Sequence, residues 1–185
     1  MPPEHRVRRR TFVAASGGLV ATALAGCTGG SDDGLPDRVE VTMRTTPYPE
    51  FDPDLAHVGV GGTVIWTLES GTHDTVAYHP DTHPPLRIPE SATPWESEKL
   101  RSVGDTFEHT FDREGVYDYV DTEAVCISHE VAGNVARVVV GWPDPDPESQ
   151  PALRPPQDDL PGVARKHFQD LNEATFELLE NRDQS

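Results

Sequence analysis

The fold of this chain is most constrained by a series of short segments, rich in β-branched and aromatic residues and separated by turns, between residues 38 and 142. In Val39-Glu40-Val41-Thr42-Met43 apolar and polar residues alternate, and residues 135–140 form a β-branched run. Further strands are predicted at residues 63–68, 75–78, 106–111 and 116–119. Strands of this length and spacing are typical of two packed sheets. The sequence therefore predicts an all-β domain over residues 38–142, built as an antiparallel β-sandwich.

Three segments outside the predicted strands have other patterns. Residues 79–103 contain five prolines and few periodic apolar residues, so we expect a long loop with one helical turn near residues 95–100. Residues 143–162 are rich in Pro and Asp, which predicts a semi-rigid, extended linker. In residues 163–185 apolar side chains recur at helical spacing, which predicts a C-terminal helix. Such a helix can pack on the sandwich or dock a partner, and the sequence leaves both interpretations open.

The first residues of the chain have the pattern of an export signal. The order Arg9-Arg10-Thr11-Phe12 resembles a twin-arginine signal, and an apolar stretch from Val13 to Ala25 follows it. That stretch is short of the roughly 20 residues that span a bilayer, which makes an uncleaved transmembrane anchor the weaker interpretation. It ends in Leu24-Ala25-Gly26-Cys27, which resembles a lipobox, the motif whose cysteine is acylated and becomes the new N-terminus.

We therefore expect residues 1–27 to be a signal peptide with a lipobox and residues 28–37 to be a flexible, polar tether. The protein would be exported, and lipid on Cys27 would hold it at the extracytoplasmic face of the cell membrane.

The charge balance of the chain excludes one class of partner. Acidic residues outnumber Lys and Arg by 32 to 15. Such a chain repels phosphate, so nucleic-acid binding is not expected. The acids are spread along the sequence, which favours a well-solvated surface as in proteins from salty environments over steering towards a basic partner.

The two cysteines point to a metal site. A pair of cysteines in an exported protein suggests a disulfide, but a lipidated Cys27 leaves Cys126 without a partner. An unpaired thiol outside the cell is soon oxidised unless it has a role, and binding a metal is the natural one. Cys126 and His129 lie three residues apart, immediately before the last predicted strand, so both can face one point. A thiolate and imidazoles suit copper in both oxidation states, or zinc.

A third ligand is expected from elsewhere in the fold. His73 is the best candidate, because it follows a glycine turn that enters a predicted strand. Five other histidines are interpreted mostly as surface residues: His57, His79, His83, His109 and His167.

At these residues the sequence resembles the plastocyanin/halocyanin-type cupredoxins. That family has one His at the start of a mid-chain strand, and a Cys-x-x-His cluster before the final strand with Gly just ahead of an axial Met. Here His73, Cys126, His129 and Gly133 fall in register, and residues 115–119 resemble the strand that leads to the cluster. The resemblance covers roughly residues 38–142. It implies a Greek-key, cupredoxin-like sandwich that holds one copper ion on His73, Cys126 and His129.

Two departures from the family pattern concern the site itself. Asn134 takes the place of the axial Met, and its harder oxygen should favour Cu(II) and lower the reduction potential if it reaches the metal. Residues 121–125 separate the aromatic strand from Cys126, whereas the family's Cys follows that strand almost at once. This longer segment could reposition Cys126, or leave Glu130 or another group to coordinate.

The resemblance implies an electron carrier that exchanges single electrons with a redox partner protein and is a monomer. The sequence offers no acid/base pair and no substrate pocket, so neither an enzyme nor a small-molecule substrate is expected. Two alternatives stay open: a copper-binding or copper-handling module with an altered, non-blue site, and a structural β-sandwich without metal.

Overall fold

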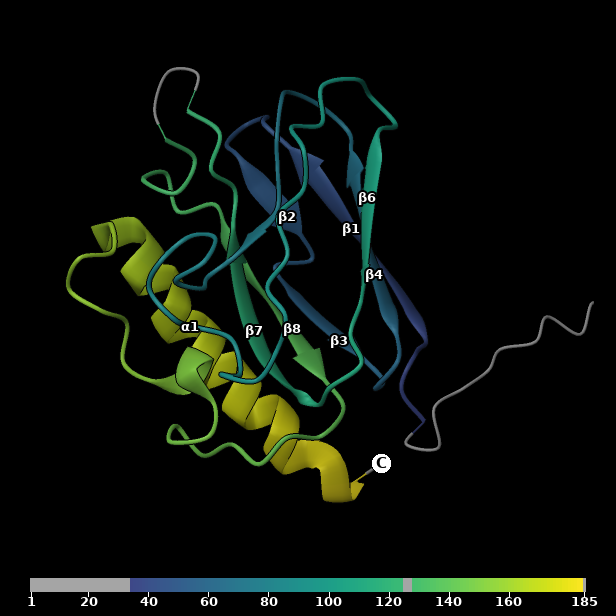
Figure 1. Ribbon diagram of the computed structural model, residues 1–185, viewed down its shortest axis with the longest axis vertical. Helices are drawn as coiled ribbons and strands as arrows, with labels where there is room; N and C mark the ends of the chain where they lie inside the picture. The colour runs from purple at the N-terminus through teal and green to yellow at the C-terminus, as the bar shows by residue number, and fades with distance from the viewer. Residues whose placement is uncertain (1–33, 125–127, 185) are drawn as a thin grey trace, which may run out of the picture.

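The computed structural model describes residues 34–124 and 128–184, and there the chain forms two four-stranded sheets packed face to face (Figure 1). One sheet has the order β2-β1-β4-β6 and the other the order β3-β8-β7-β5. The strands are β1 (Arg38–Arg44), β2 (Glu50–Asp52), β3 (Leu55–Val58), β4 (Thr63–Leu68), β5 (Val76–Ala77), β6 (Thr106–Thr110), β7 (Gly115–Val120) and β8 (Val135–Val140). A short 3-10 helix, η1 (Pro151–Leu153), then leads to α1 (Gly162–Glu180) and to η2 (Asn181–Gln184).

The predicted class, a β-sandwich followed by a C-terminal helix, is confirmed, but the two sheets are mixed and not purely antiparallel. β1 pairs with β4 in parallel, and β3 pairs with β8 in parallel. Each parallel pair needs a connection that crosses the molecule, since a tight turn can join only antiparallel neighbours. The residue pattern of a strand indicates which of its faces is buried, but not which strand it pairs with. The two parallel pairs could therefore not be predicted from the sequence.

The chain also has two strands that the sequence pattern did not predict, β2 and β3. Both are short, and Pro49 and Pro53 interrupt the segment that contains them. β2 pairs antiparallel with the end of β1, and β3 lies at the edge of the other sheet. Tertiary pairing, not local propensity, makes these residues strands.

The helical turn predicted near residues 95–100 is wrong. That segment is extended and runs along residues 73–77, with the N–H of Ala77 donating to the Trp95 carbonyl (2.9 Å) and the N–H of Leu100 donating to the His73 carbonyl (2.8 Å). Trp95 is 4% exposed and its ring contacts Trp66. Pairing with the neighbouring segment satisfies backbone N–H and C=O groups that a helix would have satisfied locally. The extended conformation also lets the Trp95 ring be buried.

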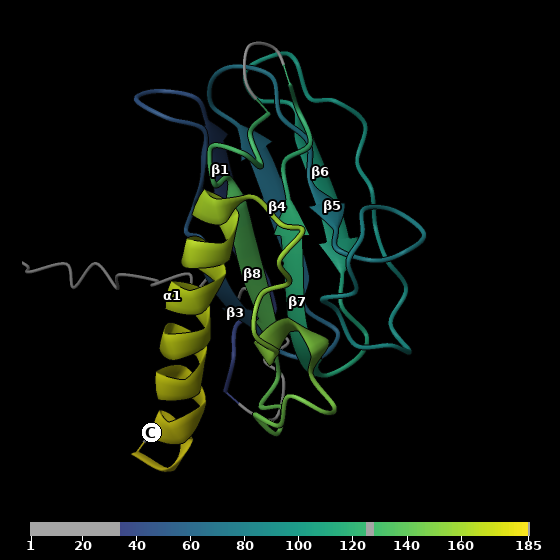
Figure 2. The same ribbon diagram turned by 90° about the vertical axis from the view of Figure 1, so that its left-hand side faces the viewer.

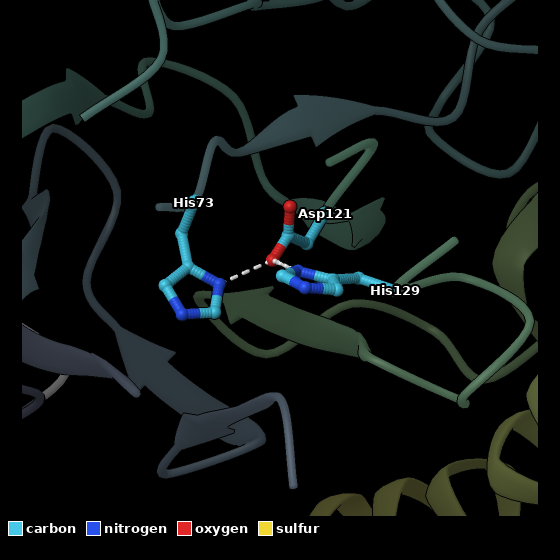
Figure 3. Close-up of side chains that lie close together, drawn as sticks. All are labelled: His73, Asp121 and His129. Carbon is cyan, nitrogen blue, oxygen red and sulfur yellow. Dashed lines mark hydrogen bonds and ion pairs between the residues drawn. The ribbon is translucent and has the colours of Figure 1, made fainter. Parts of the chain in front are cut away.

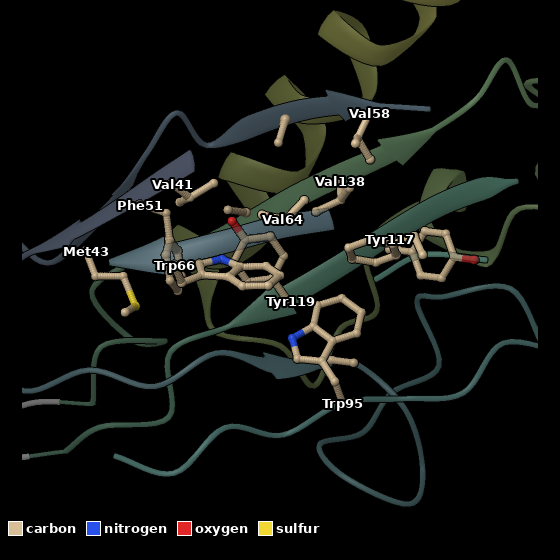
Figure 4. Packing of buried hydrophobic residues seen from close by; sticks show 14 of the residues in the cluster. Val41, Met43, Phe51, Val58, Val64, Trp66, Trp95, Tyr117, Tyr119 and Val138 are labelled. Carbon is tan, nitrogen blue, oxygen red and sulfur yellow. The ribbon is translucent and has the colours of Figure 1, made fainter. Parts of the chain in front are cut away.

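The hydrophobic core lies between the two sheets (Figure 4). At its centre the rings of Trp66 (β4) and Tyr119 (β7) meet edge to face, with 5.4 Å between centroids. Tyr119 and Val138 come from the paired strands β7 and β8, which are buried along their whole length. In this pair Val120 lies opposite Val135, so the residues just beyond them, Asp121 and Asn134, are brought together at one end of the sandwich.

Helix α1 covers the outer face of the sheet that contains β7 and β8 (Figure 2). Ala164, Phe168 and Leu171 are buried there, against Val120 and Val135 among other residues. Of the two interpretations of the C-terminal helix, packing on the sandwich is the one that the structure shows. Within the described residues no helix is both long and apolar enough to cross a membrane.

A buried charge network joins this helix to the sheet. Asp118 (β7) accepts hydrogen bonds from Arg87 (2.7 Å) and from Arg137 (β8, 2.7 Å), and all three side chains are fully buried. Arg137 also donates a hydrogen bond to the Thr175 hydroxyl on α1 (2.9 Å). Both arginines donate to the carbonyl oxygen of Ala152 in η1. The segment 143–162, for which a linker is predicted, therefore includes a turn that the buried network holds.

Candidate metal centre

Three side chains converge at the end of the sandwich where β7 stops and β8 begins (Figure 3). Nδ1 of His73 lies 2.5 Å from Oδ2 of Asp121, and Nδ1 of His129 lies 2.6 Å from the same oxygen. His73 and Asp121 are fully buried, and His129 is 7% exposed. Their potential ligand atoms all lie within 4.8 Å of one another, which is close enough for one metal ion.

His73 is held by its backbone and by its second ring nitrogen. The turn before it needs glycine, because Gly71 has φ +88° and a Cβ there would meet Thr45 Oγ1 at 2.0 Å. Nε2 of His73 lies 2.9 Å from Thr45 Oγ1, and that hydroxyl donates to the Ser70 carbonyl (3.4 Å). Thr45 therefore occupies the Nε2 side of the ring, which leaves Nδ1 on the side of Asp121.

Asp121 is the first residue after β7, and its two oxygens have separate roles. Oδ1 accepts from the backbone N–H of Glu123 (2.9 Å) and of Asp74 (3.4 Å). Oδ2 faces the two imidazoles. Burial acts to raise the pKa of Asp121, but the hydrogen bonds with His129 and His73 and the Glu123 N–H outweigh it, so the pKa is lowered and the group is a carboxylate at neutral pH.

His129 and Asn134 belong to the turn that leads into β8. The N–H of Asn134 donates to the His129 carbonyl (2.9 Å), and Gly133 between them has φ +91°. The Asn134 side chain is 2% exposed, and its Nδ2 donates to Asp121 Oδ2 (2.9 Å). Its Oδ1 is buried without a hydrogen-bond partner among the described residues. An amide with an unpartnered oxygen, beside two imidazoles and a carboxylate, fits a cation once the amide is turned by half a turn so that its oxygen faces Asp121.

The structure thus brings together three of the residues singled out from the sequence, His73, His129 and Asn134. Cys126 and Cys27 lie outside the described residues, so the predictions that they bind metal and lipid stay predictions. Glu130, considered as an alternative ligand, faces away: it accepts from the Tyr78 hydroxyl (2.8 Å) and lies 3.2 Å from His83 Nε2.

Asp121 is the member of the cluster that sequence reasoning missed. A signal was present, because Asp121 directly follows the aromatic strand, where the resembling family has its metal-binding Cys. The cluster as a whole offers two imidazole nitrogens, one carboxylate oxygen and one amide oxygen, a set that suits a divalent transition metal.

Comparison with known structures identifies the class of protein. The chain superposes on pseudoazurin from Methylobacterium extorquens AM1 with a TM-score of 0.55 at 22% identity, covering 75% of this chain and 98% of that one. Pseudoazurin from Hyphomicrobium denitrificans gives a TM-score of 0.53 at 20% identity, covering 75% and 97%. The sandwich with its buried histidine pair at one end is therefore a cupredoxin fold.

The sequence comparison is more specific than the fold. No model of a protein family matches the sequence. The chain is, however, 32% identical over 174 residues to the halocyanin of Natronomonas pharaonis, covering 72% of this chain and 98% of that protein. The chain belongs to the halocyanin family, which confirms the resemblance inferred from its motifs.

Proposed function

We propose that this protein binds one copper ion between His73 and His129 and carries single electrons. The observation that carries the proposal is that Nδ1 of both imidazoles faces one buried point. Imidazole nitrogen is a good ligand for copper in both oxidation states, and the Asn134 amide, turned by half a turn, would add an oxygen donor at the same place. Membership of the halocyanin family supports the same metal.

Copper held by His73 and His129 would supply a one-electron couple for exchange with redox partner proteins. The protein's part is to keep the ligands still. His73 is fixed by Thr45 and by two backbone hydrogen bonds to Leu100, and His129 is fixed between Glu123 and Asn134. His129 is 7% exposed whereas His73 and Asp121 are fully buried, so we propose His129 as the point where the electron enters and leaves.

A copper titration of the purified, copper-free full-length chain tests this proposal. The wild type should bind copper in an equimolar ratio and give a reversible one-electron wave in voltammetry. His73→Ala and His129→Ala should lose more than about 100-fold in copper affinity, because each removes a ligand. His57→Ala is the matched control, since this imidazole bonds the Gly141 carbonyl beyond the end of β8 that is far from the cluster, and it should bind copper normally. Failure of the wild type to bind copper would favour a structural sandwich instead.

Copper handling is the second candidate function, and the carboxylate of Asp121 in the cluster favours it. A carrier that hands copper to another protein should release it to a competing chelator within minutes and give no reversible voltammetric wave. An electron carrier should do the opposite. Exchange and voltammetry on the same sample therefore separate the two.

We also propose that the domain is exported as a monomer and held on the outer face of the membrane by lipid on Cys27. The lipobox pattern of Leu24-Ala25-Gly26-Cys27 supports this anchor. Cys27→Ala expressed in the native type of cell should leave the membrane fraction and appear in the medium. Recovery of this variant in the membrane fraction at the wild-type level would contradict the lipid anchor.

A further inference from the structure

We propose that Asp121 is itself a copper ligand, so that the metal is held by two imidazole nitrogens and a carboxylate oxygen and the site is not of the blue type. The inference rests on the proposed copper-binding function and specifies its ligand set. It assigns to Asp121 the position that a thiolate would otherwise take, and it makes Cys126 dispensable for binding.

The strand pairing fixes the position of Asp121 in the fold. Pairing of Val120 with Val135 fixes the end of β7, and the N–H of Asp121 donates to the Asn134 carbonyl (3.2 Å). The carboxylate is thereby attached to the most regular part of the sandwich. Its Oδ1 is held by backbone N–H groups, which leaves Oδ2 directed at both Nδ1 atoms.

The nitrogens involved show that Asp121 does more than orient a histidine. A carboxylate that only orients a metal-bound imidazole contacts the ring nitrogen that faces away from the metal. In His73 the two nitrogens have different neighbours: Nε2 bonds Thr45 (2.9 Å), and Nδ1 faces Asp121 (2.5 Å). Because Thr45 occupies the Nε2 side, a metal on His73 must lie on the Nδ1 side, next to Oδ2 of Asp121.

Asn134 is the second, independent observation. Its amide lies against Asp121 Oδ2, yet its own oxygen has no hydrogen-bond partner among the residues that the structure describes. Leaving a buried acceptor unsatisfied is costly, and a cation in the cluster would remove that cost once the amide is turned so that its oxygen takes the place of Nδ2 beside Asp121 Oδ2. Rotation of the amide by half a turn exchanges its oxygen and nitrogen within the same space. Asn134 thus adds a neutral oxygen donor to a set that already contains a carboxylate.

The chemical consequence is a harder site than a thiolate would make. Carboxylate and amide oxygens favour Cu(II) over Cu(I), so the reduction potential should be lower than with a sulfur ligand. Without a copper–thiolate bond, the Cu(II) protein should lack intense absorption at about 600 nm and show only weak ligand-field bands.

The test is a set of variants of the full-length chain, loaded with Cu(II) and followed by absorption, electron paramagnetic resonance and copper affinity. Asp121→Asn should lose more than about 100-fold in Cu(II) affinity, beyond the range of losing a group that merely orients a ligand. Glu130→Gln is the matched control: it makes the same acid-to-amide change beside His129 on a carboxylate that bonds Tyr78 and His83, and should bind within about threefold of wild type. Cys126→Ser should also bind as wild type, with an unchanged spectrum.

A gain of signal completes the set in case Asp121→Asn is poorly folded. Asp121→Cys in the Cys126→Ser background places a thiolate where we assign the ligand, so intense copper–thiolate absorption should appear that Cys126→Ser alone lacks. The inference is overturned if Asp121→Asn binds copper normally, or if the wild type has an intense thiolate band that Cys126→Ser abolishes. Either result leaves the copper-binding function standing, provided that His73→Ala still loses the metal. If the wild type binds no copper, the function itself fails.

Discussion

Gly71 shows how one residue without a side chain keeps a ligand in place. Its φ of +88° is in the left-handed region, and a Cβ on it would lie 2.0 Å from Thr45 Oγ1 and 3.1 Å from His73 Nε2. The hydrogen bond between Thr45 Oγ1 and His73 Nε2, which holds the His73 ring, runs through this small space. The constraint on Gly71 is therefore both conformational and steric.

We expect Gly71→Ala to lower both stability and copper affinity. The left-handed conformation alone should cost about 1–2 kcal/mol, and displacement of Thr45 from His73 should weaken copper binding by about 10-fold or more. Gly104→Ala is a matched control, because Gly104 has φ +89° but open space where a Cβ would stand. Thermal unfolding and a copper titration of both variants check this. Equal copper affinities in the two variants would contradict the steric role of Gly71.

At the scale of elements, the sheet and helix α1 are joined by charges that water cannot reach. Arg87, Asp118 and Arg137 are each fully buried, and the two guanidinium groups share one carboxylate. Their remaining donors reach Ala152 of η1 and Thr175 of α1. Such a network need not add much net stability, but removing one member leaves the others unpaired in the interior.

Asp118→Asn should therefore destabilise the protein by about 3–5 kcal/mol, because it leaves two buried arginines without their counter-charge. Asp170→Asn, which removes an exposed ion pair with Lys166 on the outer face of α1, should change stability by less than about 0.5 kcal/mol. Urea unfolding of both variants gives the two values. A similar, small effect in both would show that the network does not hold the helix.

A second contact between α1 and the sheets makes stability depend on pH. Nε2 of His167 lies 2.8 Å from Oδ2 of Asp54, and Nδ1 donates to the Gly133 carbonyl (3.0 Å). The hydrogen bond with Asp54 and the one with Gly133 raise the pKa of His167, against the effect of burial. The same hydrogen bond lowers the pKa of Asp54, again against burial.

The sign of each shift fixes the pH range in which this pair stabilises the fold. The contribution of His167 is fully present below its ordinary pKa of 6.5 and is lost as pH rises through its higher folded value. That of Asp54 is present above its ordinary pKa of 3.8 and is lost as pH falls through its lower folded value. Stability should thus fall by up to about 1 kcal/mol on going from pH 6 to pH 8. Unfolding at several pH values should show this in the wild type and not in His167→Gln.

The elements also show what the sequence can predict. β4 and β8 were predicted because each is a continuous run rich in β-branched or aromatic residues, and most of these side chains are buried. β2 and β3 were missed because a strand of three or four residues carries too little pattern. The segment from Trp95 to Leu100 was misassigned because it has few periodic apolar residues, so the local sequence does not show the pairing with residues 73–77 that makes it extended.

The candidate site likewise contains residues that the sequence predicts and one that it does not. His73 and His129 were found because their chemistry and spacing are visible in the sequence. Asp121 was missed because it is one acid among many, and its one sequence signal, its place directly after the aromatic strand, is that of a family whose ligand there is Cys. In the structure Asp121 lies at the end of β7, next to both imidazoles. The pairing of β7 with β8 brings these residues together, and the sequence does not show that pairing.

At the scale of the whole molecule, the formal net charge of −17 acts on the folded state through self-repulsion. Raising the ionic strength from 0.1 M to 1 M shortens the screening length from about 10 Å to about 3 Å. The unfolding temperature should therefore rise with salt, and NaCl and KCl should act alike because screening depends on ionic strength. A salt series in a thermal scan measures this, and a flat response would mean that the acids are too far apart to matter.

The cover that α1 places over the buried arginine pair has a consequence for the order of events in the cell. Asp118 and Arg137 are synthesised before the residues of α1 that seal them from water. A nascent chain that has formed all its strands but lacks α1 still exposes the charged side chains of Asp118 and Arg137 on the outer face of the sheet. The fold can close only after α1 has left the ribosome. Export of an already folded molecule, which the Arg9-Arg10 pattern predicts, must then wait until translation has passed α1.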